Sequence, residues 1–113
     1  MEHSISISGK TITKGSLFRS VWGSEQTNVC FYEVLAVKGQ LTLVLSRIRA
    51  RKVALGDMHG KAFPAPGEYE GEPFTRRIKS LDQRPYVAIE DYEKARLVDL
   101  EEAAQGTDFS TWG

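Results

Sequence analysis

The chain has 113 residues, of which 41% are apolar and 10% aromatic, and its 15 Lys and Arg residues balance 15 Asp and Glu residues. This length favours one domain, which buries roughly 65% of its unfolded surface and needs no disulfide or metal for stability. The zero net charge argues against a dedicated nucleic-acid-binding domain, which normally carries a basic excess.

Alternation of polar and apolar residues predicts the first strands. Residues 4–8 alternate Ser and Ile, which indicates a half-buried strand, and residues 17–22 form a second candidate. Residues 30–38 carry apolar side chains on both faces, as a central strand does. Gly39 and Gln40 then supply a short hairpin turn.

The segment after this turn changes phase along its length. Leu41, Leu43 and Leu45 share one face, but the same parity then continues with three arginines. Beyond this point the apolar side chains, those of Ile48 and Ala50, lie on the opposite face. One straight strand cannot bury both halves, so we predict a bulge or a sharp bend near residues 45–47.

Glycine and proline dominate residues 53–73, which we expect to form a long loop. Alternation returns at residues 74–79, where we predict a fifth strand. Arg84 and Pro85 interrupt the pattern, and residues 86–89 follow as a sixth strand.

The C-terminal part contains good helix formers. We expect one or two helical turns around residues 97–104, ended by Gly106. Residues 107–113 are expected to form a flexible tail, and residues 1–106 a single domain. Short strands at near-regular spacing predict a mainly β fold, a small antiparallel barrel of the SH3-like or a similar kind.

Charge is distributed unevenly along the chain. Residues 1–52 carry a formal charge of +5 and residues 80–113 a charge of −5, while the middle is balanced. Such asymmetry affects the choice of partner, unless the two parts lie side by side and cancel.

Cys30 is the single cysteine, so an intramolecular disulfide is excluded, and a reducing, cytoplasmic location is expected. The first thirty residues show neither a long apolar run nor a cleavage-site pattern, so we expect no signal peptide and no membrane span. Cys30 begins an apolar strand without a neighbouring histidine, which favours a buried, inert thiol over a nucleophile.

Two motifs suggest a family. The run Trp22-Gly23-x-x-Gln26-Thr27-Asn28 is followed by an aromatic-rich strand, and Pro64-x-Pro66-Gly67 comes later. Together they resemble small uncharacterised proteins encoded by phages, plasmids and other mobile elements. Ser24 departs from the aromatic residue that those proteins often carry after Trp-Gly.

The resemblance implies an accessory or counter-defence factor, since small proteins of mobile elements often have that role. We therefore expect a non-enzymatic protein, monomeric or homodimeric, that docks on a host protein such as a CRISPR or restriction effector and blocks it, as an anti-CRISPR protein does. The expected contact residues are Trp22, Glu25, Gln26, Asn28, Tyr32, Tyr69 and Glu70. The amides of the polar turn suit an internally bonded turn equally well.

An alternative is a nucleic-acid-binding module. Two basic strand segments form a positive patch if they pair with each other, and guanidinium groups bind phosphates in a bidentate manner. The residues of this patch are Arg47, Arg49, Arg51, Lys52, Arg76 and Arg77. The competing interpretation is that these charges are solvated or internally paired.

A metal-dependent enzyme is disfavoured. Residues 56–60 read Gly-Asp-Met-His-Gly, which superficially resembles an element of binuclear metallophosphatases. Two metals need several further His, Asp and Asn ligands, and His3 is the only other histidine besides His59. We expect a polar turn here, with no catalytic residue, no metal and no cofactor.

Overall fold

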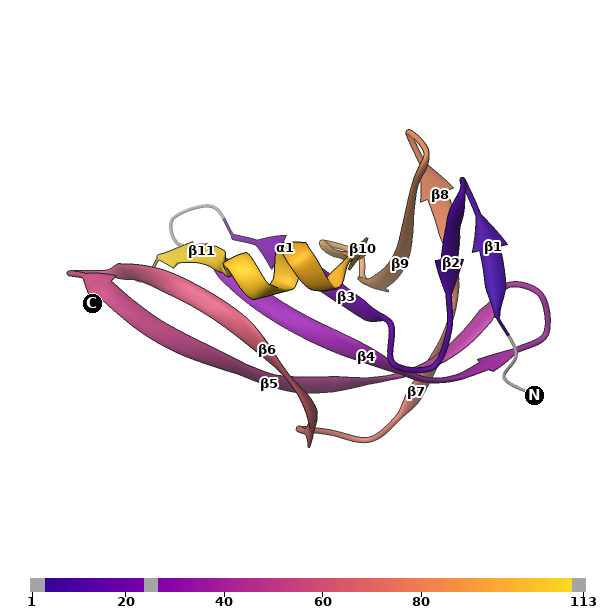
Figure 1. The fold of residues 1–113 in the computed structure, drawn as a ribbon, viewed down its shortest axis with the longest axis horizontal. Coiled ribbons are helices and arrows are strands. Elements are labelled where there is room, and N and C mark those ends of the chain that lie inside the picture. Colours follow the sequence, from indigo (N-terminus) through magenta and orange to yellow (C-terminus); the bar gives the residue numbers. More distant parts are fainter. Residues whose placement is uncertain (1–3, 24–26, 111–113) are drawn as a thin grey trace.

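An antiparallel sheet that curls on itself dominates residues 4–23 and 27–110, which are the residues that our computed structural model describes (Figure 1). The elements are β1 (Ile5–Ile7), β2 (Lys10–Ile12), β3 (Leu17–Trp22), β4 (Asn28–Lys38), β5 (Thr42–Gly56), β6 (His59–Tyr69), β7 (Phe74–Arg77), β8 (Lys79–Leu81), β9 (Arg84–Glu90), β10 (Glu93–Val98), α1 (Leu100–Gln105) and β11 (Thr107–Ser110). The main sheet follows the order β11-β6-β5-β4-β3-β10-β9-β8, and β7 pairs with β5 beside this path. The mainly β, antiparallel fold class is therefore confirmed.

The sheet forms a half-barrel rather than a fully hydrogen-bonded barrel. Backbone pairing joins β7 to β5 and β9 to β10, whereas the sheet order contains no pairing of β7 with β9 within the described residues. The side chain of Arg76 crosses this gap and donates hydrogen bonds to the carbonyl oxygens of Ala88, at 3.0 Å, and Ile89, at 3.3 Å. An arginine side chain on β7 thus bonds to β9 where a backbone ladder is missing.

The predicted change of phase in β5 is confirmed. Leu43 and Leu45 are buried, and the buried parity then switches to Ser46 and Ile48. The extra residue lies in the partner strand, because Val34 pairs with Leu45 whereas Ala36 pairs with Val44, two positions along β4 against one along β5. A bulge at this position bends the sheet.

The expectation of a long loop over residues 53–73 is wrong. β5 continues to Gly56, and β6 returns along it after a tight turn in which Met58 has a φ of 67°. Glycine and proline suggested a loop because they are rare in central strands. Here Pro64 and Pro66 lie beyond the part of β6 that pairs with β11, so their missing N–H groups break no hydrogen bond of that ladder.

The glycine at position 60 has a packing role. A Cβ built at Gly60 would lie 2.2 Å from the carbonyl oxygen of Val53 and 2.9 Å from the ring of Phe109. β5 and β11 therefore approach β6 too closely at this point for any side chain to fit. Gly60, which contributed to the expectation of a long loop, is therefore required by close packing of strands.

The C-terminal segment is more ordered than expected. The residues before Asp99 form strand β10, and α1 begins only after Asp99, whose carboxylate caps the helix by accepting the N–H of Glu102 at 2.7 Å. Gly106 ends the helix as predicted. Residues 107–110, expected to belong to a flexible tail, form β11 and pair with β6.

Among residues 4–23 and 27–110, the buried apolar side chains form two clusters. One fills the half-barrel and includes Phe18, Val34 and Leu43, with Ile5 and Ile12 contributed by the separate β1–β2 hairpin. The other includes Phe31 and lies under α1 and β11. The principal-axis extents of 46 × 27 × 26 Å and Figure 1 agree that the long β5–β6 hairpin extends one end of the molecule.

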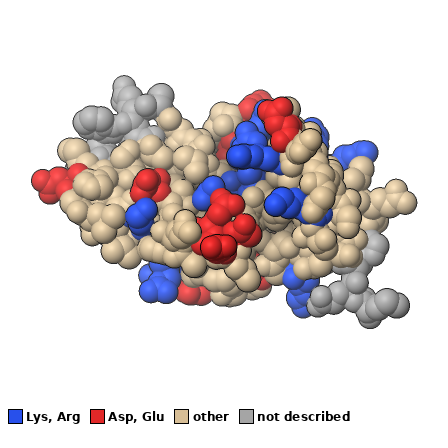
Figure 2. Space-filling model, turned by 45° about the horizontal axis from the view of Figure 1, so that its top comes forward, with Lys and Arg blue, Asp and Glu red and all other residues tan. Residues whose placement is uncertain are grey.

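The basic and acidic parts of the chain lie side by side. β3, from the basic N-terminal half, pairs with β10 from the acidic C-terminal third. Figure 2 shows cationic and acidic side chains next to each other on one face of the molecule. In the part of the chain described, no helix has the length and apolar character needed to cross a membrane.

Candidate functional site

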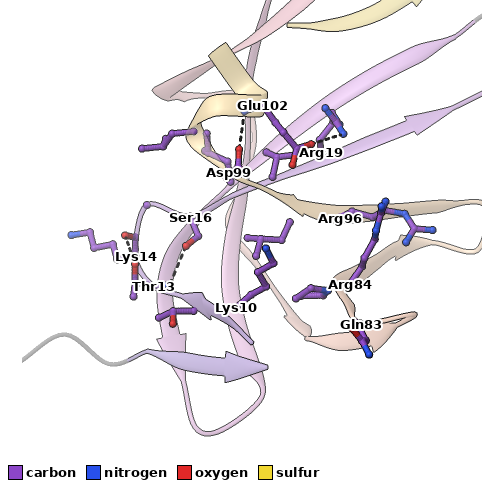
Figure 3. A pocket seen from close by; sticks show the side chains of 17 residues that line it. Lys10, Thr13, Lys14, Ser16, Arg19, Gln83, Arg84, Arg96, Asp99 and Glu102 are labelled. Carbon is purple, nitrogen blue, oxygen red and sulfur yellow. Dashed lines mark hydrogen bonds and ion pairs between the residues drawn. The ribbon is translucent and has the colours of Figure 1, made fainter. Parts of the chain in front are cut away.

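A hollow in the described part of the chain has a volume of about 740 Å³ (Figure 3). The β2–β3 turn, the β8–β9 turn and the β10–α1 junction enclose it, so segments far apart in sequence meet there. We call this hollow the cationic groove. Its lining residues are Lys10, Thr11, Thr13, Lys14, Gly15, Ser16, Leu17, Arg19, Gln83, Arg84, Pro85, Arg96, Leu97, Val98, Asp99, Leu100 and Glu102.

Two tight turns shape the rim of the cationic groove. In the β8–β9 turn, Asp82 and Gln83 have φ angles of 52° and 63°, the left-handed geometry of a two-residue hairpin turn. In the β2–β3 turn, the side-chain oxygen of Ser16 accepts the backbone N–H of Thr13 at 3.0 Å. Lys14 lies in the β2–β3 turn and Arg84 directly follows the β8–β9 turn, so these turns place both cations at the rim of the groove.

Four cationic side chains of the groove are exposed: Lys10, Lys14, Arg84 and Arg96. None of them forms an ion pair or a side-chain hydrogen bond with residues 4–23 or 27–110. Arg96 pairs in register with Tyr86, two residues from Arg84, and Figure 3 shows both arginines on one side of the groove with Lys14 on the other. A phosphate is the natural partner of such groups, because guanidinium binds it in a bidentate manner.

The acidic residues at the rim have partners of their own. Glu102 lies 3.5 Å from Arg19, whose guanidinium also donates to the hydroxyl of Thr107 at 3.0 Å. Asp99 caps α1. Five cations and two carboxylates line the groove, so its formal charge is +3 although the whole chain is neutral.

Apolar side chains complete the groove. Leu17, Pro85 and Val98 are buried along it, whereas Leu100 at the start of α1 is 77% exposed. A pocket of this size that combines apolar surface with a few convergent charged groups is typical of ligand sites. The arrangement suits a ligand that has both phosphate groups and flat or apolar parts.

A second hollow of about 480 Å³ lies at the mouth of the half-barrel, and we call it the inner hollow. The carboxylate of Glu93 lies there, only 5% exposed. Its Oε2 atom accepts hydrogen bonds from the hydroxyls of Ser20, at 2.5 Å, and Tyr32, at 2.6 Å. Burial, followed by the hydrogen bond to Glu93, raises the pKa of the Tyr32 phenol well above its ordinary value.

The residues expected to contact a host protein are placed in different environments. Trp22 is half-buried and Tyr32 is buried, and both line the inner hollow. Asn28 is half-buried and donates from its side-chain nitrogen to the carbonyl oxygen of Trp22 at 3.3 Å, as the internally bonded turn requires. Glu25 and Gln26 lie outside the described residues.

Tyr69 and Glu70, the remaining members of that set, follow the Pro-x-Pro-Gly motif. Ile48 pairs with Tyr69 but Ala50 pairs with Pro64, so residues 65–68 bulge out of β6. Glu33, 8% exposed, accepts hydrogen bonds from the backbone N–H of Gly67 and the hydroxyl of Tyr69, each at 2.9 Å. The motif therefore builds a bulge fastened by a carboxylate, and the hydrogen bond to Glu33 raises the pKa of Tyr69.

The basic residues of the predicted strand patch do not lie together in one patch. β5 and β7 do pair, but Arg76 lies opposite Leu43 and Arg77 opposite Thr42, so that of the β5 arginines only Arg47 lines a hollow together with Arg76. Arg76 is half-buried, and its hydrogen bonds go to backbone carbonyl oxygens.

Most of the patch residues on β5 have a partner. Arg47 lies 3.9 Å from Glu70, and Arg49 lies 3.4 Å from Glu68. The ammonium group of Lys52 lies 5.3 Å from the ring centroid of Phe109. Arg51, like Arg77, is exposed.

The residues weighed for catalysis are placed as follows. Cys30 is a buried free thiol. His59 is exposed at the tip of the β5–β6 hairpin, with Nδ1 3.2 Å from the carbonyl oxygen of Asp57. The described residues contain no group of three or more His, Cys, Asp or Glu side chains arranged to hold a metal ion.

Sequence reasoning missed both hollows. The cations of the groove come from three separate segments, and the sequence around Arg84 indicates only a break in a strand pattern. Charges that are close in sequence, such as those of residues 47–52, are easily recognised in a sequence. The charges of the groove are far apart in sequence and are brought together by strand pairing.

Comparison of the chain with protein-family models, with curated proteins and with solved structures found no match.

Proposed function

We propose that the protein binds single-stranded nucleic acid in the cationic groove. The observation that carries this proposal is the set of four exposed cations, Lys10, Lys14, Arg84 and Arg96, around one hollow without a carboxylate partner among the described residues. Proteins that hold single strands combine a positive groove for the backbone with surfaces for the bases. The wall of the groove offers the bases an aliphatic surface that includes Leu17, Pro85 and Val98, in place of the aromatic side chains on which bases stack in many such proteins.

The geometry favours a short contact. The hollow of about 740 Å³ has room for a few groups rather than a long duplex. Neutralising Z phosphates of a single strand gives a slope of about −0.7Z in a plot of log affinity against log salt. Four contacts correspond to a slope of about −3.

The test is fluorescence anisotropy with a short labelled oligothymidylate between about 50 and 200 mM salt. The variant Arg84→Ala/Arg96→Ala should weaken binding at least about tenfold and make the slope less steep. The matched control is Arg47→Ala/Arg49→Ala, which removes the same charge from two arginines that already have Glu partners. Equal losses in both variants, or no binding by the unmodified protein at the lowest salt, would contradict the proposal.

A second candidate is the predicted docking on a host effector. Val53 and Leu55, at alternate positions of β5, are 48% and 57% exposed, and Met58 in the adjoining turn is 48% exposed. An exposed apolar patch at the tip of a hairpin is a common feature of protein contact sites. If this tip blocks a purified CRISPR or restriction nuclease, Val53→Ser/Leu55→Ser should abolish inhibition while oligothymidylate binding is unchanged.

A further inference from the structure

The inner hollow contains a buried carboxylate without a cationic partner. Glu93 is 5% exposed and accepts hydrogen bonds from two neutral hydroxyls, those of Ser20 and Tyr32, both at Oε2. No ion pair joins Glu93 to another described residue. An ionised carboxylate removed from water costs free energy unless a positive charge or several donors compensate it.

Two aromatic pairs line the same hollow as this carboxylate, and one of their members, Tyr92, is 68% exposed. The rings of Trp22 and Tyr92 meet edge to face with centroids 5.4 Å apart, and those of Tyr32 and Phe74 do so at 5.9 Å. All four residues line the inner hollow. Ring faces attract cations through their quadrupole, and cages of such rings recognise alkylammonium groups.

One donor in the hollow is also unused. The indole Nε1 of Trp22 is buried and has no hydrogen-bond partner within the described residues. Buried indole N–H groups normally have one. An ammonium group cannot accept this hydrogen, so the indole N–H serves as a nearby reporter of the site, and it is the carboxylate without a cationic partner that points to a missing cation.

The two arginines that line the hollow do not supply the missing charge. Arg47 lies 3.9 Å from the carboxylate of Glu70. Arg76 directs its donors to backbone carbonyl oxygens and stacks its guanidinium 4.8 Å from the ring centroid of Phe74. The lining residues carry two guanidiniums and two carboxylates, those of Glu90 and Glu93, but Arg47 is shared with Glu70 outside the lining and Arg76 is bonded to the backbone.

We infer that the inner hollow binds an alkylammonium group, either of a small amine or of a lysine side chain. The carboxylate of Glu93 compensates the positive charge, and the aromatic walls enclose the methylene groups. This site is separate from the cationic groove, whose lining shares no residue with it. Its failure would therefore leave the nucleic-acid proposal unaffected.

The first test is a titration of the unmodified protein, and a substitution serves only to assign its signal. The indole N–H signal of Trp22, assigned by its loss in Trp22→Phe, is followed by NMR during titration with n-butylammonium chloride, 1-butanol and sodium chloride. The two organic probes have the same shape and differ in charge. We expect a saturable shift with butylammonium and at least about tenfold weaker binding of butanol. Equal binding of both probes, or no saturable shift up to about 10 mM, would overturn the inference.

The second test removes the charge of the carboxylate while an acceptor oxygen remains for the two hydroxyls. Glu93→Gln should lose butylammonium binding, whereas Glu101→Gln, a matched change on the exposed face of α1, should bind as the unmodified protein does. Retained binding in Glu93→Gln would count against the proposal. If Glu93→Gln does not fold, the comparison of butylammonium with butanol in the unmodified protein still tests whether the site recognises a positive charge.

The source of the ammonium group is distinguished by a third probe, the peptide acetyl-Gly-Lys-Gly-amide. Binding of the peptide at least as tight as that of butylammonium identifies the ligand as a lysine side chain of a partner protein. Binding of butylammonium alone identifies a small amine. If neither butylammonium nor the peptide binds, the inference is wrong. The Ser20–Glu93–Tyr32 cluster would then serve only to join β3, β4 and β10.

Discussion

The cationic groove and the inner hollow differ in the exposure of their charged side chains. In the groove, four cations are exposed and have no described partner, so the fold does not depend on them. In the inner hollow, the carboxylate of Glu93 is buried and joins three strands through hydroxyl groups. Exposed charges contribute little to stability, whereas buried polar groups contribute strongly once they are hydrogen-bonded. Substitutions in the groove should separate binding from folding, and substitutions in the inner hollow should affect both.

The largest effect is expected for Glu93→Ala. It leaves the hydroxyls of Ser20 and Tyr32 buried without their acceptor, and each orphaned group costs about 1–3 kcal/mol. We expect the free energy of unfolding, measured by urea denaturation, to fall by about 3 kcal/mol. Glu93→Gln should lose less than half as much. A loss below about 0.5 kcal/mol for Glu93→Ala would show that the cluster is not structural.

The next effect concerns alkaline pH. The raised pKa of Tyr32 means that the folded state keeps the phenolic proton at a pH where the unfolded state, with an ordinary pKa of 10.0, loses it. The contribution to stability is therefore fully present below pH 10.0 and is lost as pH rises above it, by at most about 1.4 kcal/mol for each pH unit.

Urea denaturation at several pH values, in the unmodified protein and in Tyr32→Phe, measures this contribution. The stability of Tyr32→Phe should fall less steeply above pH 10.0. Parallel curves for the two proteins would show that Tyr32 does not carry the effect.

A smaller effect on stability is expected in the groove. Arg84→Ala/Arg96→Ala removes two exposed side chains that have no ion pair among the described residues. The free energy of unfolding should change by no more than about 0.5 kcal/mol, although oligothymidylate binding weakens at least about tenfold. Destabilisation of the size expected for Glu93→Ala would remove the contrast between the two hollows.

The smallest effects belong to the arginines of β5. The ion pairs of Arg47 with Glu70 and of Arg49 with Glu68 are about half exposed, so solvent screens them. Arg49→Ala should change the free energy of unfolding by less than about 0.5 kcal/mol. Thermal denaturation monitored by circular dichroism measures this, and a larger loss would assign the pair a structural role.

Local patterns were sufficient for much of the fold. The pattern of residues 17–22 located β3 with its observed limits, and the predicted change of phase in β5 coincides with a bulge whose extra residue lies in β4. The stop signal at Gly106 also held. These features depend on near neighbours in the chain, so residue order alone reveals them.

Predictions failed where distant segments decide the outcome. Gly60 looked like a loop residue, but it lies in a strand because Val53 and Phe109 approach it closely. The sequence leaves Arg76 open as a nucleic-acid-binding, solvated or internally paired charge, and the structure directs its donors to backbone carbonyl oxygens of β9 rather than to a carboxylate. Neither contact leaves a signal in the neighbouring sequence.

The order of residues by itself determined that the chain forms an antiparallel, mainly β domain with a short C-terminal helix, because side-chain periodicity and turn residues act locally. Only the tertiary structure decided which charges meet. Strand pairing brought Arg84 and Arg96 to one groove and buried Glu93 beside Tyr32. Electrostatic surroundings depend on distances through space, and these distances follow from the register of strands rather than from separation along the chain.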